Sequence, residues 1–112
     1  MKPPAITIEG SLEPASALER RRHPRVGVTF MAVFRTPHGF YGCLVVDLSR
    51  GGAKLSFDET PLVMAGDPVT LLIEPFGEFR AETMWHRGEF AGIRFLDPPA
   101  KIAAAFHHVL AA

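Results

Sequence analysis

The feature that most constrains the fold is a series of short segments with alternating apolar residues, separated by turn signals, between residues 26 and 95. In Val26–Thr36 every second residue is apolar, which is typical of a β-strand with one buried face. Proline and glycine mark the breaks, as in Thr36–Gly39 and Pro75–Gly77. The expected strands are Val26–Thr36, Phe40–Asp47, Ala53–Phe57, Pro68–Glu74, Phe79–Trp85 and Glu89–Phe95.

The last segment has a different period and predicts one C-terminal helix, from about residue 99 to 110, packed on the sheet or over its open end. Asp97 is expected to cap this helix and Pro98 to occupy its first position. The helical spacing is carried by Ile102, Phe106, Val109 and Leu110. We therefore predict an all-β fold with one C-terminal helix, a six-stranded antiparallel barrel, because closure removes the exposed edges of an open sheet.

Length and composition indicate one globular domain. The chain has 112 residues, of which 47% are hydrophobic and 21% charged, so global disorder is excluded. No apolar run reaches the roughly 18 residues of a membrane span, and residues 1–10 do not resemble a signal peptide. Residues 1–19, interrupted by prolines, are expected to form a flexible arm, and residues 20–112 the folded domain. We expect no further N-terminal domain, because the arm is too short to form one.

Single cysteine, tryptophan and histidine positions carry further information. Cys43 is the only cysteine, which excludes an internal disulfide and a cysteine-based zinc site and fits a cytoplasmic location; we expect a packed thiol. Trp85 is expected in the core, because Phe79, Ala81 and Thr83 share its face. The pair His107–His108 lacks a third ligand, so no metal site is predicted, and no arrangement of Ser, His and Asp indicates an enzyme.

Two charged motifs indicate a ligand class. The chain is neutral overall, yet nine of its twelve basic residues are arginines and four of those lie in Arg20–Arg25. The second motif, Asp47–Gly52, carries a carboxylate, a hydroxyl and two glycines. Because the first two strands pair antiparallel, Arg25 and Asp47 are expected at the same edge of the sheet. Guanidinium groups match phosphates and the guanine edge, a carboxylate accepts from guanine nitrogens, and glycines permit positive φ and close approach. Together these groups fit a guanine nucleotide.

The motifs Arg21-x-x-x-Arg25 and Asp47-x-Ser49-x-x-Gly52 resemble those of the PilZ domain, a family that binds the bacterial second messenger cyclic di-GMP. The segment Gly92–Phe95 is also similar to the pattern near the final PilZ strand. The resemblance covers about residues 20–110. Either motif alone is common, whereas both in this order within six strands and a helix are specific.

The resemblance implies a role for each matching residue. Arg21 and Arg25 would hold the guanine edges and phosphates, Asp47 and Ser49 would bind a guanine, and Gly52 would shape the loop. An arginine at Arg20 implies an intercalated pair of ligands, two per chain, which could also bridge a homodimer. Further residues that could contact the ligand are Arg22, His23, Arg50 and Gly51. No cofactor or metal is implied.

The expected function is a cyclic di-GMP receptor that closes its N-terminal arm over the ligand and thereby signals to an effector protein. Without ligand the crowded arginines repel one another, and a dianionic ligand would gather them. Two alternatives remain open. The first is a PilZ-type adaptor that binds protein but no nucleotide. The second is a small barrel that binds single-stranded nucleic acid, which would call for exposed aromatic residues interleaved with basic ones.

Overall fold

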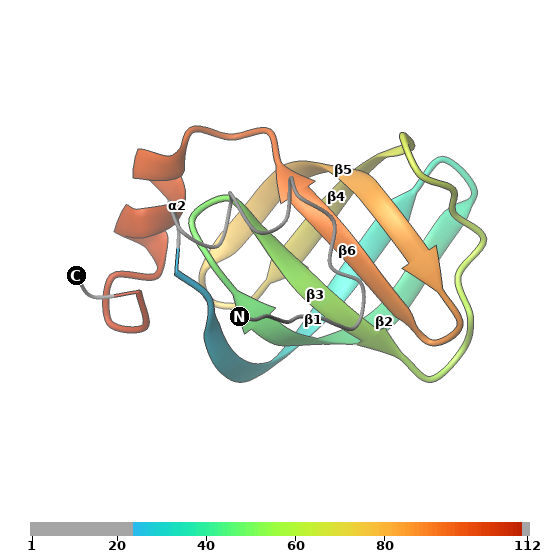
Figure 1. Ribbon diagram of the computed structural model, residues 1–112, viewed down its shortest axis with the longest axis horizontal. Coiled ribbons are helices and arrows are strands. Elements are labelled where there is room, and N and C mark those ends of the chain that lie inside the picture. The colour runs from blue at the N-terminus through green and yellow to red at the C-terminus, as the bar shows by residue number, and fades with distance from the viewer. Residues whose placement is uncertain (1–23, 111–112) are drawn as a thin grey trace, which may run out of the picture.

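The computed structural model describes residues 24–110, and within them it confirms a closed antiparallel barrel of six strands followed by one short helix (Figure 1). The observed elements are β1 (Val26–Thr36), β2 (Gly39–Leu48), β3 (Gly52–Phe57), β4 (Pro68–Ile73), β5 (Gly77–Arg87), β6 (Phe90–Phe95) and α2 (Pro99–Ala105). Each strand lies where the alternation places it, with ends that shift by two residues or fewer. Alternation is a reliable signal here because each strand buries only one face.

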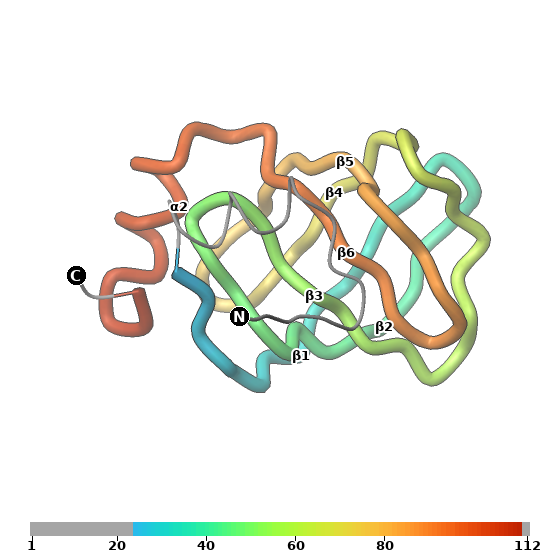
Figure 2. Tube along the Cα trace, in the orientation of Figure 1, coloured from blue at the N-terminus to red at the C-terminus, as the bar shows by residue number. Residues whose placement is uncertain are grey.

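Closure of the barrel rests on β1, which pairs with β2 on one side and with β4 on the other. The strand order around the barrel is β1-β2-β3-β6-β5-β4, and every neighbouring pair is antiparallel. Figure 2 shows the chain trace of the six strands around the barrel wall, with α2 at one end. No strand of this barrel therefore presents a whole unpaired edge.

The interior is filled by the alternate residues of all six strands. The fully buried large side chains include Phe34, Phe79, Leu55, Leu71 and Ile73. Cys43 is also buried, as the sequence indicated, and burial raises the pKa of its thiol to about 12. A thiol that stays protonated at neutral pH is a packing group rather than a nucleophile.

The helix α2 lies over one open end of the barrel (Figure 1). Phe106, at its C-terminal end, is fully buried, and its ring centre lies 4.5 Å from that of Phe76, 5.3 Å from that of Phe79 and 6.1 Å from that of Phe30. The helix ends at Ala105, earlier than the predicted residue 110, because Phe106 leaves the helical conformation (φ −113°, ψ 32°) where it joins this aromatic cluster. Turns continue the chain to Leu110.

Asp97 does not cap the helix, contrary to expectation. The N-cap is Pro98, which offers no side-chain cap, and the helix starts at Pro99. The buried carboxylate of Asp97 instead accepts a hydrogen bond from the Arg80 backbone N–H at 3.0 Å. It also forms ion pairs with the side chains of Arg80 at 3.5 Å and Lys101 at 3.4 Å. Asp97 therefore ties the β6–α2 connection to β5.

Trp85 is also not in the core, contrary to expectation. The β5–β6 register shifts between Thr83 and Trp85, so alternation is interrupted and Trp85 comes opposite Gly92. The indole is half-buried and lies directly against Gly92, where an added Cβ would come within 2.1 Å of Nε1. The bulge takes Trp85 off the inner face that Thr83 occupies.

Replacement of Phe106 by alanine tests the role of the aromatic cluster. We expect Phe106→Ala to lower the free energy of unfolding by about 3–5 kcal/mol, because it empties the centre of the barrel's covered end. Urea denaturation measures this loss. The exposed neighbour His107 provides the control, and His107→Ala should change stability by less than about 0.5 kcal/mol. Equal stability of the two variants would show that α2 does not seal the barrel.

Asp97 gives a pH-dependent contribution to stability. Burial raises the pKa of the Asp97 carboxyl. The Arg80 amide and the charges of Lys101 and Arg80 lower this pKa by more, so that it lies below the ordinary value. A lowered folded pKa stabilises the protein at neutral pH, and this stability is lost as the pH falls through that pKa. We expect Asp97→Ala to cost about 1.5–3 kcal/mol at pH 7, measured by urea denaturation, and progressively less below about pH 4. A difference in unfolding free energy between wild type and variant that does not change with pH would contradict this role. Glu74→Ala, at an exposed carboxylate, serves as the control.

Candidate functional site

The candidate site is built on an ion pair between the residue that precedes β1 and the end of β2. Arg25 Nη1 donates a hydrogen bond to Asp47 Oδ1 at 2.7 Å. The two side chains are 24% and 28% exposed, so both charges remain accessible to a ligand. The antiparallel hairpin therefore brings Arg25 and Asp47 to one edge, as the strand lengths predicted. This end of the barrel is also the end covered by α2 (Figure 1).

A register shift orients Asp47. The β2–β3 pairing shifts between Val45 and Asp47, and the matching part of β1 is irregular as well. Val45 and Leu48 are both fully buried, so three positions, not two, separate successive inward side chains at this point. Asp47 consequently lies off the inner face and comes opposite Gly27 of β1. Uninterrupted alternation would have aimed the carboxylate into the barrel.

The turn that follows Asp47 is organised by Ser49. Its Oγ accepts hydrogen bonds from the N–H groups of Gly51 and Gly52, both at 3.1 Å, and lies 3.3 Å from the Gly52 carbonyl, to which it donates. The Ser49 N–H also donates to the Gly52 carbonyl at 2.9 Å. Ser49 is 2% exposed, and its hydroxyl has no capacity left for a further donor or acceptor. Its observed role is to hold the turn.

Gly52 is needed for packing rather than for an unusual backbone conformation. Its φ is not in the left-handed region, but an added Cβ would lie 2.2 Å from the Ile93 carbonyl oxygen of β6. The turn is also tied to β6 by the Phe95 N–H, which donates to the Gly51 carbonyl at 2.8 Å. β6 therefore supports the turn closely from one side, and any side chain at Gly52 would push the two strands apart.

Two further cations lie beside the site. In the backbone register, Lys54 of β3 is opposite Asp47 of β2, and Arg94 of β6 is opposite Gly52 of β3. Arg94 forms an ion pair with Glu82, and the Lys54 ammonium lies 4.7 Å from the ring centre of Phe90. Neither was singled out as a site residue. Alternation in the third strand predicts that Lys54 points outward. It does not predict that Lys54 lies opposite Asp47, because that register depends on the shift between Val45 and Asp47.

The structure thus brings together Arg25, Asp47 and the turn through Ser49, Arg50, Gly51 and Gly52. The predicted site residues Arg20, Arg21, Arg22 and His23 lie outside the described residues. Chemically, the assembled part offers a guanidinium fork for phosphate or a purine edge, and a carboxylate that accepts from nitrogen donors. Among residues 24–110 there is no group of three His, Cys, Asp or Glu side chains that could hold a metal ion. No helix in the same range is long and apolar enough to cross a membrane.

Solved structures with this fold include domains of three bacterial proteins. The chain superposes on the PilZ domain of CeSA from a cellulose-synthesizing bacterium with a TM-score of 0.57 and 17% identity, covering 76% of this chain and 93% of that one. The PilZ domain of Escherichia coli YcgR with c-di-GMP gives a TM-score of 0.57 and 16% identity, with coverages of 80% and 88%. The MrkH–c-di-GMP complex of K. pneumonia gives 0.58 and 20%, covering 80% of this chain but only 51% of MrkH. At these identities the likeness establishes the fold.

A search of curated proteins finds no match. The PilZ domain family, in contrast, matches residues 19–111, which includes both charged motifs and the entire barrel. The resemblance seen in the motifs is therefore confirmed over most of the sequence, and the chain belongs to the PilZ domain family.

Proposed function

We propose that this protein is a cyclic di-GMP receptor whose ligand binds at the Arg25–Asp47 edge of the barrel. The observation that carries the proposal is the partly exposed ion pair at 2.7 Å, positioned beside the turn that Ser49 organises. Family membership and two solved relatives described as c-di-GMP complexes support the same ligand. PilZ domains are receptor and adaptor domains, so no catalytic step is proposed.

Each described side chain has a distinct role in this proposal. Asp47 accepts hydrogen bonds from the N1–H and amino group of one guanine, while Arg25 holds the Asp47 carboxylate and offers its remaining N–H groups to the phosphate or the guanine edge. Ser49 is a positioning residue, because its hydroxyl is fully engaged within the turn. Gly52 keeps the turn seated against β6.

The proposal also includes residues outside the described range. Arg20, Arg21, Arg22 and His23 are separated from Arg25 by Pro24 alone. They add three cations to a site whose described carboxylate is already paired. A dianionic ligand offsets this excess positive charge through charge-assisted hydrogen bonds. Arg20 is the residue that we associate with a stacked pair of ligands. Arg22, His23, Arg50 and Gly51 are assigned secondary contacts.

Isothermal titration with cyclic di-GMP tests the ligand and the site. We expect Arg25→Ala and Asp47→Ala each to weaken binding roughly ten- to a hundredfold, because each removes charge-assisted hydrogen bonds worth about 1.5–3 kcal/mol. Arg35→Ala is the matched control, since it breaks an ion pair with Glu78 elsewhere on the barrel and should leave affinity unchanged. About two ligands per chain would support the role of Arg20.

Three results of the titration would contradict the proposal. Equal binding of GTP would indicate a generic anion site. Wild-type affinity in both site variants, with the fold verified by circular dichroism, would place the ligand elsewhere. Absence of any binding would favour the adaptor function that needs no nucleotide.

We further propose that ligand binding closes the segment before Arg25 over the site and presents an altered surface to an effector protein. Limited trypsin digestion tests this step, because Arg20, Arg21 and Arg22 are cleavage sites. Cyclic di-GMP should slow cleavage at these arginines severalfold while leaving cleavage at Arg87, far along the chain, unchanged. Identical cleavage rates with and without bound ligand would exclude closure.

A further inference from the structure

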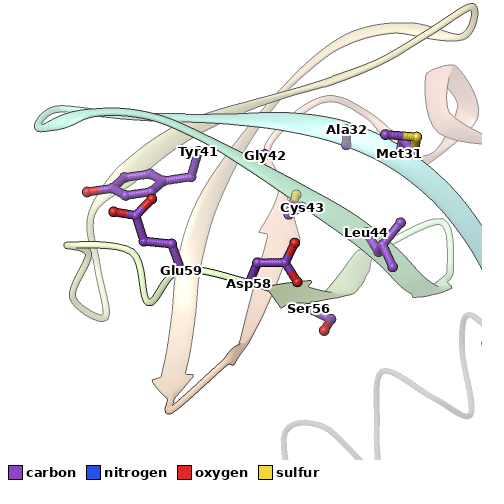
Figure 3. A pocket seen from close by; sticks show the side chains of 9 residues that line it. All are labelled: Met31, Ala32, Tyr41, Gly42, Cys43, Leu44, Ser56, Asp58 and Glu59. Carbon is purple, nitrogen blue, oxygen red and sulfur yellow. The ribbon is translucent and has the colours of Figure 1, made fainter.

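A groove lies beside the point where β2 and β3 separate. Figure 1 shows this point on the side of the barrel away from α2. The β2–β3 ladder ends at the pair Cys43–Phe57, so residues 39–42 of β2 pair with β1 alone. Beyond Phe57 the chain turns away and leaves a cavity of about 420 Å³ between itself and β2 (Figure 3). Tyr41 fixes the outer wall, because its hydroxyl accepts a hydrogen bond from the Leu62 N–H at 3.0 Å.

One side of the groove is apolar and exposed. Met31 and Leu44 are cross-strand partners on β1 and β2, and they are 80% and 38% exposed. Val33 and Leu72, which are also partners, continue this apolar row from β1 to β4. Between the side chains, Gly42 leaves open space, since an added Cβ would have no atom within 4 Å. A contiguous exposed apolar surface of this kind is typical of an interaction site.

The other side of the groove is acidic. Asp58 and Glu59 are exposed, and within residues 24–110 neither carboxylate has an ion-pair or hydrogen-bond partner. In Figure 3 the Asp58 carboxylate reaches toward β2 beside Cys43, and the Glu59 carboxylate lies beside the Tyr41 ring. The residues lining the groove include no lysine or arginine. The carboxylates of Asp47, Glu78, Glu82 and Asp97 are paired with basic side chains, whereas within residues 24–110 those of Glu74 and Glu89 are exposed and unpaired.

We propose that this groove binds a segment of a partner protein that carries a lysine or arginine flanked by apolar side chains. The cation lies between the carboxylates of Asp58 and Glu59, and the apolar side chains cover Met31 and Leu44. A second copy of the chain is disfavoured, because a two-fold contact through the groove would bring the same two carboxylates of each copy together. The groove is separate from the Arg25–Asp47 site, so the inference does not depend on the ligand proposed there.

A pair of model peptides tests the chemistry of the partner. The probe is a fluorescein-labelled peptide of alternating leucine and lysine, and its counterpart replaces every lysine with glutamate. By fluorescence anisotropy we expect saturable binding of the lysine peptide, weakened by salt, and none of the glutamate peptide. In ¹⁵N-resolved NMR spectra the lysine peptide should shift the amides of residues 31, 42–44 and 56–59. Shifts spread over the whole barrel, or confined to another face, would overturn the proposal.

Variants separate groove binding from nonspecific attraction. Asp58→Asn combined with Glu59→Gln should weaken the lysine peptide roughly tenfold, because two exposed charge pairs are lost. Gly42→Trp should abolish binding by filling the groove, and the open space at its Cβ allows the barrel to fold. The control Glu74→Gln removes the charge of an exposed carboxylate elsewhere on the barrel. Equal losses of peptide affinity in the groove variants and the control would refute the site, as would no binding by the folded wild type. Concentration-dependent dimerisation that Gly42→Trp abolishes would assign the groove to a second copy of the chain.

Discussion

The pairing of β1 along both of its edges is the constraint on which the rest of the structure depends. Contacts with β2 are local in sequence, but those with β4 join Val33 to Leu72 and thereby convert a meandering sheet into a barrel. Closure fixes the inner face of every strand. The open end is then covered by two fully buried side chains, Ile102 of α2 and Phe106 at its C-cap. Because β1 begins directly after Arg25, the same strand that closes the barrel also anchors the candidate site.

Register shifts in β2 and β5 interrupt the alternation of inward and outward side chains, and the candidate site depends on the shift in β2. In β2 the shift before Asp47 lets Leu48 take the next inward position and turns the carboxylate toward Arg25. In β5 the shift after Thr83 takes Trp85 off the inner face and lays its indole on Gly92. Both follow one physical rule, since an extra residue in a strand exchanges the faces of all residues beyond it. A barrel can accept such shifts because the strands on either side hold the pairing.

The sequence was sufficient to predict all six strands from alternation, and the placement of Arg25 and Asp47 at one edge of the sheet from antiparallel pairing. The register shift that turns the Asp47 carboxylate toward Arg25 is not visible in the alternation. Positions decided by tertiary contacts could not be predicted in this way. The cap assigned to Asp97 failed because its carboxylate finds three partners on Arg80 and Lys101. Gly52 was expected to provide backbone freedom, whereas the carbonyl of Ile93, from a strand about forty residues later, is what requires a glycine there.

The packed interior of the barrel separates the Arg25–Asp47 site at one end from the groove at the other. Phe34, Leu55 and Leu71 are fully buried along the body of the barrel, and cores packed at this density do not deform continuously. The turn at Gly52 is already seated against β6, and Tyr41 holds the wall of the groove at the opposite end. We therefore expect a ligand at Arg25 to leave the groove unchanged. We expect the groove to be permanently available, and any change that depends on the ligand to arise in the segment before Arg25.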